Sequence, residues 1–275
     1  RHPDLYGQYL VEKLEEDKKE NVNTDLRIFE YKFKKPEFVK NSGLKSLKKI
    51  SSLPADHPAK QYIVSRKIPN PYHAKLFLVD KFKAWVNEQV PDKFDPTKMD
   101  KDDARIVIPL IDRENRLVGV QGRSLDPVDK IRYISIMLDD EAVKLYNFET
   151  CDPSKDVYVF EGPFDAMFLP NSIASCGGHL TSNLVQIDDV VNKEKFIICY
   201  DNEPRNKDIV RNIGRAIKQG FRTVIWPSDF EYKDVNDAIK DGMEVCDIQR
   251  IIDKRTFMGL EAELEFNVWK KTAGL

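Results

Sequence analysis

The sequence predicts an α/β protein: a doubly wound parallel sheet, preceded by a mixed α+β region and followed by C-terminal helices. Three short apolar runs in the second half carry this prediction, at residues 157–160, 196–200 and 223–226. A run that is apolar at nearly every position suits a strand buried on both faces, as in a parallel sheet with helical crossovers. Segments with helical spacing separate the runs, which gives the alternation that such a sheet requires.

Composition sets wide limits on function. The 275 residues are 41% hydrophobic, which is enough to bury a substantial core in one or two domains. Charged residues make up 33%, but they nearly cancel to a net charge of -2, so local patches must decide whether nucleic acid binds. The four cysteines include no C-x-x-C pair, which indicates neither a zinc site nor a disulfide framework. No apolar run reaches the length of a membrane span and no signal peptide is recognisable, so we expect a cytoplasmic protein.

The first part of the chain predicts a helix followed by a basic linker. Apolar residues recur at helical spacing between residues 3 and 19. Between Arg27 and Lys49, eight basic residues stand against two acids, with four aromatic residues among them. Such a stretch is either a solvated linker or an arm that contacts phosphates and stacks its rings on bases.

Residues 54–150 predict short helices and then a small group of strands. Helices are expected near residues 59–66, 70–73 and 82–86, with His57 and His73 in capping or turn roles beside prolines. A strand at 105–110, a turn at 112–116 and a return strand at 117–122 read as a hairpin. A further strand-like segment at 133–136 is interleaved with cations, which taken alone are typical of exposed positions that aid solubility or protect a sheet edge.

From residue 151 onward the expected elements alternate. The first strand is followed by a short helix at 166–169, a strand at 173–176 that runs into Gly177-Gly178, and a crossover helix at 180–191. A further helix lies between Arg205 and Gly220, with Gly220 ending it. Helical segments after residue 237 close the chain. We therefore expect four parts, with bounds 1–53, 54–150, 151–242 and 243–275.

Each of the three central apolar runs leads into a cluster of carboxylates. The carboxylates are Glu161 and Asp165 after the first run, Asp201 and Glu203 after the second, and Asp234 and Asp237 after the third. Open α/β sheets place ligand sites outside the carboxyl ends of their strands, so these acids should converge at one edge. A single cluster is ordinarily a helix cap, but three in register repel one another unless a cation neutralises them.

The chemistry of these clusters indicates which cation they would bind. Oxygen ligands without cysteine or histidine favour magnesium or manganese over zinc. Such an ion serves phosphoryl or nucleotidyl transfer, because it polarises a phosphate and lowers the pKa of an attacking hydroxyl. Gly162 permits close approach of the backbone, and Pro163 sets the turn that brings Asp165 back beside Glu161. His179, just past two glycines, is a turn residue or a phosphate contact.

The same residues resemble a known domain family. Glu161-Gly162-Pro163-Phe164-Asp165 after a strand, Asp201-Asn202-Glu203 after the next core strand, and Lys233-Asp234-Val235-Asn236-Asp237 further on are similar to the Toprim domain. Bacterial-type primases, topoisomerases and some nucleases share that domain. The sequence departs from the family pattern twice, because Glu203 replaces the second aspartate of the strict triplet and Asn236 stands where cellular primases often have an aspartate.

The upstream region resembles primases in particular. Residues 105–109, Gln121-Gly122-Arg123 and residues 130–133 are similar to the signature that precedes Toprim in bacterial-type primases. The resemblance extends to the T-even-type bacteriophage primases, the priming subunits of phage helicase-primases. It runs in order along almost the whole chain, through Pro3-Asp4-Leu5-Tyr6, Asp56-His57-Pro58, Gly177-Gly178, the Asp201 to Arg205 segment and the terminal Trp269.

The resemblance implies an activity, which is DNA-templated synthesis of RNA primers by metal-dependent nucleotidyl transfer. It implies that Glu161, Asp201 and Glu203 are catalytic and bind Mg²⁺ or Mn²⁺, with Asp165, Asp234 and Asp237 completing the metal site. It implies nucleotide or template contacts by Arg123, Arg132, Lys144, Lys233 and Arg205. The implied partners are single-stranded DNA, ribonucleoside triphosphates and a replicative helicase, in the cytoplasm of a phage host. Zinc is expected only in the family's N-terminal module, whose cysteines are missing here.

Two other readings remain open at this point. A Toprim nuclease would use the same metal site to hydrolyse phosphodiesters, but it has no evident need for the upstream primase signature. A non-catalytic replication scaffold would use its acids as helix caps and would bind no magnesium. A topoisomerase is disfavoured, because the chain is too short to hold a separate tyrosine-bearing domain and a strand gate.

Overall fold

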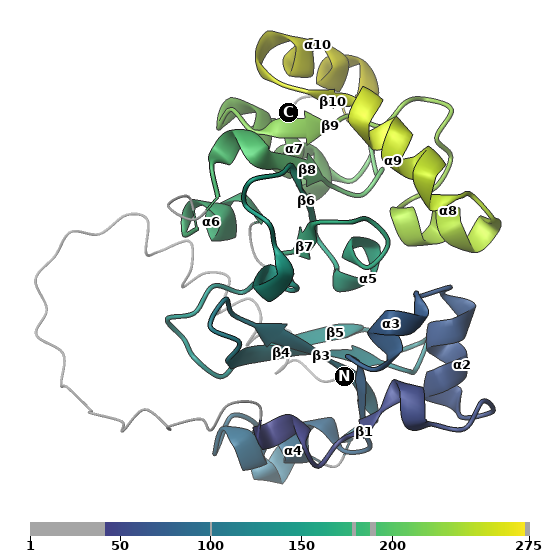
Figure 1. Cartoon of the computed structure of the whole chain (residues 1–275), viewed down its shortest axis with the longest axis vertical. Coiled ribbons are helices and arrows are strands. Elements are labelled where there is room, and N and C mark those ends of the chain that lie inside the picture. Colours follow the sequence, from purple (N-terminus) through teal and green to yellow (C-terminus); the bar gives the residue numbers. More distant parts are fainter. Residues whose placement is uncertain (1–41, 100, 178–179, 188–190, 273–275) are drawn as a thin grey trace, which may run out of the picture. The chain divides into compact units, whose positions relative to one another are not determined.

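The computed structural model describes residues 42–99, 101–177, 180–187 and 191–272, which form two five-stranded sheets with their helices (Figure 1). The strand order is β1-β2-β3-β4-β5 in the first sheet and β10-β9-β8-β6-β7 in the second. The helix predicted at residues 3–19, the basic linker up to residue 41, and Gly178 and His179 lie outside the described residues.

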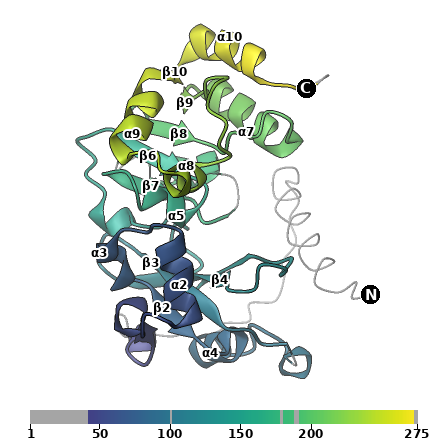
Figure 2. The same ribbon diagram turned by 90° about the vertical axis from the view of Figure 1, so that its right-hand side faces the viewer.

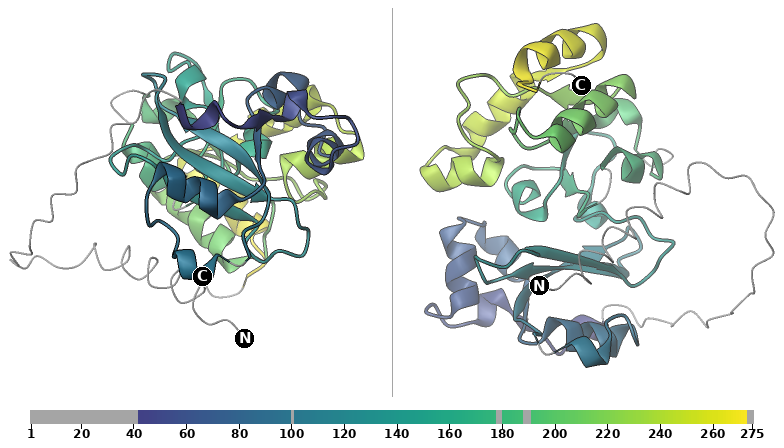
Figure 3. Two further views of the ribbon diagram at one scale, coloured as in Figure 1. Left: turned by 90° about the horizontal axis from the view of Figure 1, so that it is seen from below. Right: turned by 180° about the vertical axis from the view of Figure 1, so that it is seen from behind.

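The first sheet is antiparallel and contains the predicted hairpin. Its strands are β1 (Lys48–Lys49), β2 (Phe77–Val79), β3 (Arg105–Ile111), β4 (Leu117–Ser124) and β5 (Tyr133–Met137). Helix α4 (Phe82–Gln89) covers one face of this sheet, where Phe82 and Val86 pack with Val107 and Val120 (Figure 3). Alternate residues of a strand face opposite sides, and so Ile106 and Ile108 of β3 belong to the core shared with the second sheet.

Two short helices begin as their capping residues predict. Helix α2 (Pro58–Ser65) has Pro58 at its first position, and the His57 ring accepts a hydrogen bond from the Ala59 amide at 3.1 Å. Helix α3 (Asn70–His73) ends at His73, whose Nε2 lies 2.8 Å from the carbonyl oxygen of Ile68. The predicted capping role of His57 is confirmed, whereas His73 lies buried in the last turn of α3 and caps no helix start.

The second sheet has the predicted parallel core. Strands β6 (Val157–Phe160), β7 (Ser172–Ala174), β8 (Phe196–Cys199) and β9 (Arg222–Val224) are parallel, and β6 lies between β7 and β8. Strand β10 (Thr256–Phe257) adds an antiparallel edge that was not predicted, because two residues carry no periodic signal. Every residue of β6, β7 and β8 is buried, which explains their continuous apolar runs.

Helices cover both faces of the second sheet, which is therefore doubly wound (Figure 2). Helix α7 (Lys207–Lys218) lies on one face, and α8 (Val235–Asp241) and α9 (Val245–Lys254) lie on the other. Helix α10 (Gly259–Trp269) packs on α7. Asn206 caps α7 by accepting from the Asp208 amide, and Gly220 follows the helix with φ 76°, as predicted.

Two helix predictions need correction. The short helix α5 runs over Pro163–Ala166 rather than 166–169, because Pro163 is suited to the first helical position and starts the helix earlier. Asp165 therefore lies inside α5 instead of before it. Helix α6 spans Leu180–Val185 and ends earlier than the predicted residue 191, with residues 188–190 outside the described chain.

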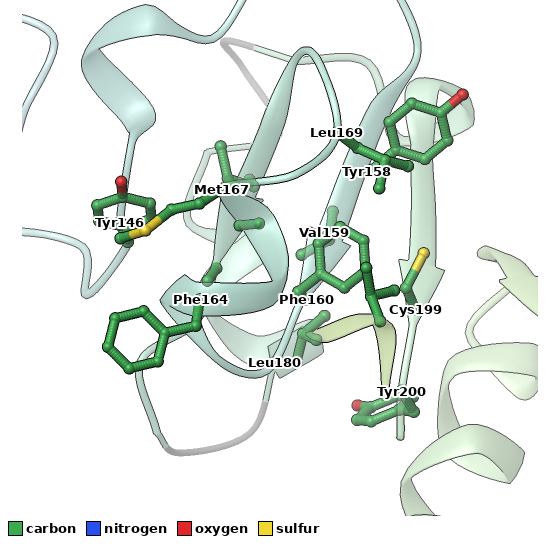
Figure 4. Packing of buried hydrophobic residues seen from close by; sticks show 14 of the residues in the cluster. Tyr146, Tyr158, Val159, Phe160, Phe164, Met167, Leu169, Leu180, Cys199 and Tyr200 are labelled. Carbon is green, nitrogen blue, oxygen red and sulfur yellow. The ribbon is translucent and has the colours of Figure 1, made fainter. Parts of the chain in front are cut away.

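The core around β6 is formed by side chains from several parts of the chain. Figure 4 shows Phe164 and Met167 of the α5 region on one side of β6, and Cys199 and Tyr200 at the end of β8 on the other. All four cysteines are free, and Cys151, Cys176 and Cys199 are buried, where a thiol packs as a small apolar group. Among the described helices, none has both the length and the apolar character needed to span a bilayer.

Candidate active site

The carboxylate clusters meet beyond the carboxyl ends of the two central strands. Glu161 directly follows β6, and Asp201 comes two residues after β8. The two strands pair with Phe160 opposite Cys199, so both loops leave the sheet at the same level. The charges of Asp201 and Glu203 act on Glu161, so the three catalytic candidates lie within electrostatic reach of one another.

Glu161 is the most perturbed of these three acids. Burial, reinforced by Asp201 and Glu203, raises its pKa to about 8, while the Lys233 ammonium opposes the rise. Its Oε1 atom is buried and has no hydrogen-bond partner within the described chain. A buried acceptor without a partner is costly unless an ion or water reaches it, so Glu161 presents an open ligand position.

Asp201 and Glu203 share a lysine. The Lys233 Nζ lies 3.3 Å from Asp201 Oδ2 and 3.6 Å from Glu203 Oε2. Burial raises the pKa of Asp201 to about 6 against the opposing effect of Lys233. Within the described residues, no three acidic, histidine or cysteine side chains are arranged closely enough to hold a metal ion. The Lys233 ammonium partly neutralises the charges of Asp201 and Glu203.

Asp165 and Asp234 form a second acidic pair beside the first group. Burial, then the charges of Asp234 and Asp201, raise the pKa of Asp165 well above its usual range, and the Asn236 amide donates to its Oδ1 at 2.9 Å. Asp234 is the N-cap of α8 and accepts from the Asp237 amide at 2.7 Å. Burial also raises the pKa of Asp234. Asp234 thus combines the ordinary capping role with membership of the acidic group.

The donor set fits a divalent ion. Glu161, Asp201 and Glu203 offer only oxygen atoms, the ligands that magnesium and manganese take in proteins. Their mutual repulsion is relieved only in part by Lys233, and one Glu161 oxygen has no protein partner among the described residues. A divalent cation would neutralise the repulsion among the acids and would give the unpaired Glu161 oxygen a partner.

Asp237 is placed differently from the other candidates. Its carboxylate lies 3.3 Å from the Lys240 ammonium on the same helix, and its side chain is 44% exposed. Its metal-binding role stays a prediction that no contact in the structure supports.

The cations that were predicted to bind phosphates differ in their exposure and in their contacts. Arg123 is only 8% exposed and its guanidinium lies over the rings of Tyr133 and Tyr62, 4.6 Å and 5.5 Å from their centroids. Its Nε is buried without a partner in the part of the chain described here. Arg132 and Arg205 are exposed and Lys144 is half-buried. Of these cations, Lys233 forms ion pairs with two of the catalytic candidates, Asp201 and Glu203.

Asn236 has a structural role that explains why it departs from the family pattern. Its Nδ2 donates to the Arg66 carbonyl oxygen at 2.7 Å, and its Oδ1 accepts from Arg66 Nη1 at 2.5 Å. Arg66 also lies over the rings of Tyr62 and Phe164. The side chain of Asn236 is therefore engaged with α2, while its backbone amide holds Asp165.

Asn202 and Trp269 belong to the segments that resemble primases, but their contacts at the site, like those of Arg66, were not identified from the sequence. Arg66 follows Tyr62 by four positions and bonds to its hydroxyl at 2.7 Å, a helical pairing that the sequence could have indicated. Its bond to Asn236 joins residues 170 positions apart, which no local pattern reveals.

Comparison with known proteins decides the family. Over 272 residues the chain is 30% identical to the DNA primase of Enterobacteria phage T4, covering 98% of this chain and 76% of that protein. This chain belongs to the T4-type DNA primase family. Residues 158–239 of this primase-family chain match the family model described as Toprim-like, a range that contains all six candidate carboxylates.

Solved primase structures share the fold. The Escherichia coli primase catalytic core gives a TM-score of 0.55 at 19% identity, covering 78% of each chain. The zinc-binding and RNA polymerase domains of Aquifex aeolicus primase give 0.56 at 18% identity, covering 79% of this chain and 64% of that one. A DnaG primase catalytic domain bound to single-stranded DNA gives 0.56 at 19% identity, covering 81% and 78%. This T4-type chain therefore has the fold of the bacterial primase catalytic core.

Proposed function

We propose that this chain synthesises RNA primers on single-stranded DNA, joining ribonucleotides at the rim that carries Glu161, Asp201 and Glu203. The observation that carries the proposal is the convergence of these three acids in a chain of the T4-type primase family. The 3'-hydroxyl of one nucleotide attacks the α-phosphate of the next, and pyrophosphate leaves. The partners we assign are template DNA, ribonucleoside triphosphates and a replicative helicase, in the cytoplasm of the host cell.

The metal ligands we assign are Glu161, Asp201 and Glu203. Bound Mg²⁺ or Mn²⁺ supplies polarisation of the α-phosphate and a lower pKa for the attacking hydroxyl. Asp165, whose pKa burial raises well above its usual range, holds the start of α8 by accepting from the Asn236 amide. Asp234 fixes the same helix from its N-cap position.

Lys233 has two successive roles in this proposal. Without a divalent ion its ammonium pairs with Asp201 and Glu203. With an ion held by those carboxylates, the ammonium would be available to pair with a triphosphate oxygen. The same side chain then contributes to nucleotide binding.

The remaining cations act on nucleic acid or nucleotide phosphates. Arg132 and Arg205 are exposed, and Lys144 is partly so, which suits contacts that hold a strand without reading its sequence. Arg123 is different because two aromatic rings already pack against its guanidinium. The rings fix the plane of the guanidinium, so its free edge can meet a phosphate with little loss of side-chain entropy.

The test is dinucleotide synthesis on a single-stranded template with ribonucleoside triphosphates and magnesium. Asp201→Asn should reduce synthesis to less than about 1% of the unchanged protein, because the variant loses one charged ligand. Glu261→Gln, an exposed position on α10, is the matched control and should keep full activity. Full activity of Asp201→Asn would contradict the proposal, and cleavage of labelled template without synthesis would favour a nuclease instead.

A further inference from the structure

The loop that carries Asp201 and Glu203 is supported by the C-terminal end of α10. Between the two acids stands Asn202, whose Oδ1 accepts a hydrogen bond from Trp269 Nε1 at 3.0 Å. Trp269 is the last residue of α10 and is 7% exposed. The indole is thus anchored in the core while its N–H reaches the acidic loop.

Asn202 also forms hydrogen bonds with the segment that precedes α8. Its backbone amide donates to the Lys233 carbonyl oxygen at 2.6 Å. Its side-chain Nδ2 donates to the carbonyl oxygens of Phe230 and Tyr232, at 2.7 Å and 3.1 Å. The backbone and side-chain donors of Asn202 thus all bond to the segment that ends at Lys233. Its side-chain acceptor bonds to the indole of Trp269.

Neighbouring positions of the loop are held in the same way. The Trp226 indole donates to the Tyr200 carbonyl oxygen at 2.8 Å, and the Lys271 amide donates to the Pro204 carbonyl oxygen at 2.9 Å. The supports thus fall at residues 200, 202 and 204, while the acids occupy residues 201 and 203. The backbone turns here, because the Glu203 amide donates to the Asp201 carbonyl oxygen at 2.9 Å and the Asn206 amide to the Glu203 carbonyl oxygen at 3.0 Å. The bonds at residues 200, 202 and 204 therefore hold the turn that carries both carboxylates.

We propose that Trp269 and Asn202 are positioning residues, which set the direction of the Asp201 and Glu203 carboxylates and their distance from Lys233. This inference rests on the proposed function, because it concerns the same metal ligands. Neither residue touches the metal or the nucleotide. Loss of the indole N–H removes one hydrogen bond to the loop. Ion binding must then order the two carboxylates, and this cost lowers the affinity for the ion.

The test compares two tryptophans. Trp269→Phe removes the N–H but keeps an aromatic ring in the core. Trp85→Phe is the matched control, because Trp85 is also buried but its Nε1 has no hydrogen-bond partner among the described residues. Mn²⁺ affinity is measured by electron paramagnetic resonance, and Tm by thermal unfolding of the metal-free protein.

We expect Trp269→Phe to weaken Mn²⁺ binding roughly 2- to 10-fold, the range that the net contribution of one neutral hydrogen bond allows. Trp85→Phe should bind Mn²⁺ as tightly as the unchanged protein. In primer synthesis, Trp269→Phe should raise the Mg²⁺ concentration that gives half the maximal rate, and the rate at saturating Mg²⁺ should recover. A purely structural role of Trp269 would lower Tm without shifting this concentration.

A double-mutant cycle supplies the second measurement. Asn202→Ala alone should also weaken Mn²⁺ binding, and adding Trp269→Phe to it should cause no further loss, because the shared bond is already gone. Unchanged Mn²⁺ affinity in Trp269→Phe, or independent additive losses in the cycle, would overturn the positioning roles while leaving the metal site intact. Absence of Mn²⁺ binding by the unchanged protein would overturn the proposed function itself.

Discussion

The first sheet and the rim of the second sheet differ in how their buried charged groups are paired. In the first sheet, the buried Arg105 pairs with Asp103 and Asp129 at 2.9 Å and 2.8 Å. Gln121 donates to Ser135 Oγ and to the Cys176 carbonyl oxygen, which links the first sheet to the loop after β7, although its Oε1 has no partner among the described residues. At the rim of the second sheet, Glu161, Asp165 and Asp201 stand close to other acids, and burial leaves their charges poorly compensated.

This difference separates framework from site. A polar group that is buried and fully paired stabilises one arrangement of the chain and has no remaining capacity for a ligand. A group that is buried with like charges nearby stores an unfavourable interaction that a ligand can relieve. The primase signature contributes framework residues, such as the paired Arg105. Gly122, for example, makes room for Phe82, because an added Cβ would lie 2.5 Å from a ring carbon.

The largest effect expected is at the rim. Glu161→Gln removes a ligand charge but keeps the shape of the side chain, so primer synthesis should fall by at least about 10³-fold, or roughly 4 kcal/mol of transition-state stabilisation. The fold should survive, because glutamine has nearly the shape of the protonated glutamic acid that the raised pKa favours in the metal-free protein. Dinucleotide synthesis and circular dichroism measure the two effects. Activity within tenfold of the unchanged protein would remove Glu161 from the catalytic group.

The next effect tests the framework. Arg105→Ala leaves Asp103 and Asp129 without their cation, so the free energy of unfolding should fall by about 3 kcal/mol. Mn²⁺ affinity of the folded variant should not change. Urea unfolding measures the loss, with Arg211→Ala as a control that removes only an exposed pair with Asp208. A weaker metal affinity in Arg105→Ala would show that framework and site are not separate.

The third effect is a pH dependence that belongs to the rim. The folded state raises the pKa of Glu161 from 4.5 to about 8, so between these values the unfolded chain loses a proton that the folded protein keeps. The free energy of unfolding of the metal-free protein should therefore fall as pH rises through this window, by up to roughly 1.4 kcal/mol per pH unit from this group. Below pH 4.5 its contribution is constant.

Glu161→Gln is also the control for this measurement, since it should flatten the slope between pH 6 and pH 8. Divalent-ion binding at pH 7 should release protons, because the ligands must be ionised. Calorimetry in buffers of different ionisation enthalpy counts those protons. An unchanged slope in Glu161→Gln would place the raised pKa elsewhere.

The smallest effect concerns the outermost acid. Asp237 pairs with Lys240 and is nearly half exposed, so Asp237→Asn should change Mn²⁺ affinity by less than about twofold. Asp234→Asn, which alters a buried member of the acidic group, should have a larger effect in the same assay. Equal losses in the two variants would extend the metal site to α8.

What the sequence predicted well was local. Strands β6 and β8 were found because burial on both faces leaves an unbroken apolar run, and Glu161 and Asp201 were found because they end those runs. The register of parallel strands then brings the acids together by a general rule, so the rim could be expected without coordinates.

What the sequence could not supply was specific pairing between distant segments. The bonds of Asn236 to Arg66 and of Asn202 to Trp269 depend on how helices pack, and asparagine is common in turns for other reasons. Strand β10 was missed because its two residues give no periodicity. It also joins the second sheet from beyond residue 242, where only helices were expected, and so the proposed boundary after residue 242 cuts through the elements of one sheet.

The pairing of Phe160 with Cys199 has a further consequence for assembly. A shift of one residue between β6 and β8 would send their buried side chains to the wrong face, so the packed core permits one alignment only. The unfolded chain offers no ready-made cage for a cation, since the acidic side chains come from separate loops. The strand register is set by packing of the core and needs no cation. Removing the cation with a chelator should for this reason leave a folded protein that regains activity when the cation is restored.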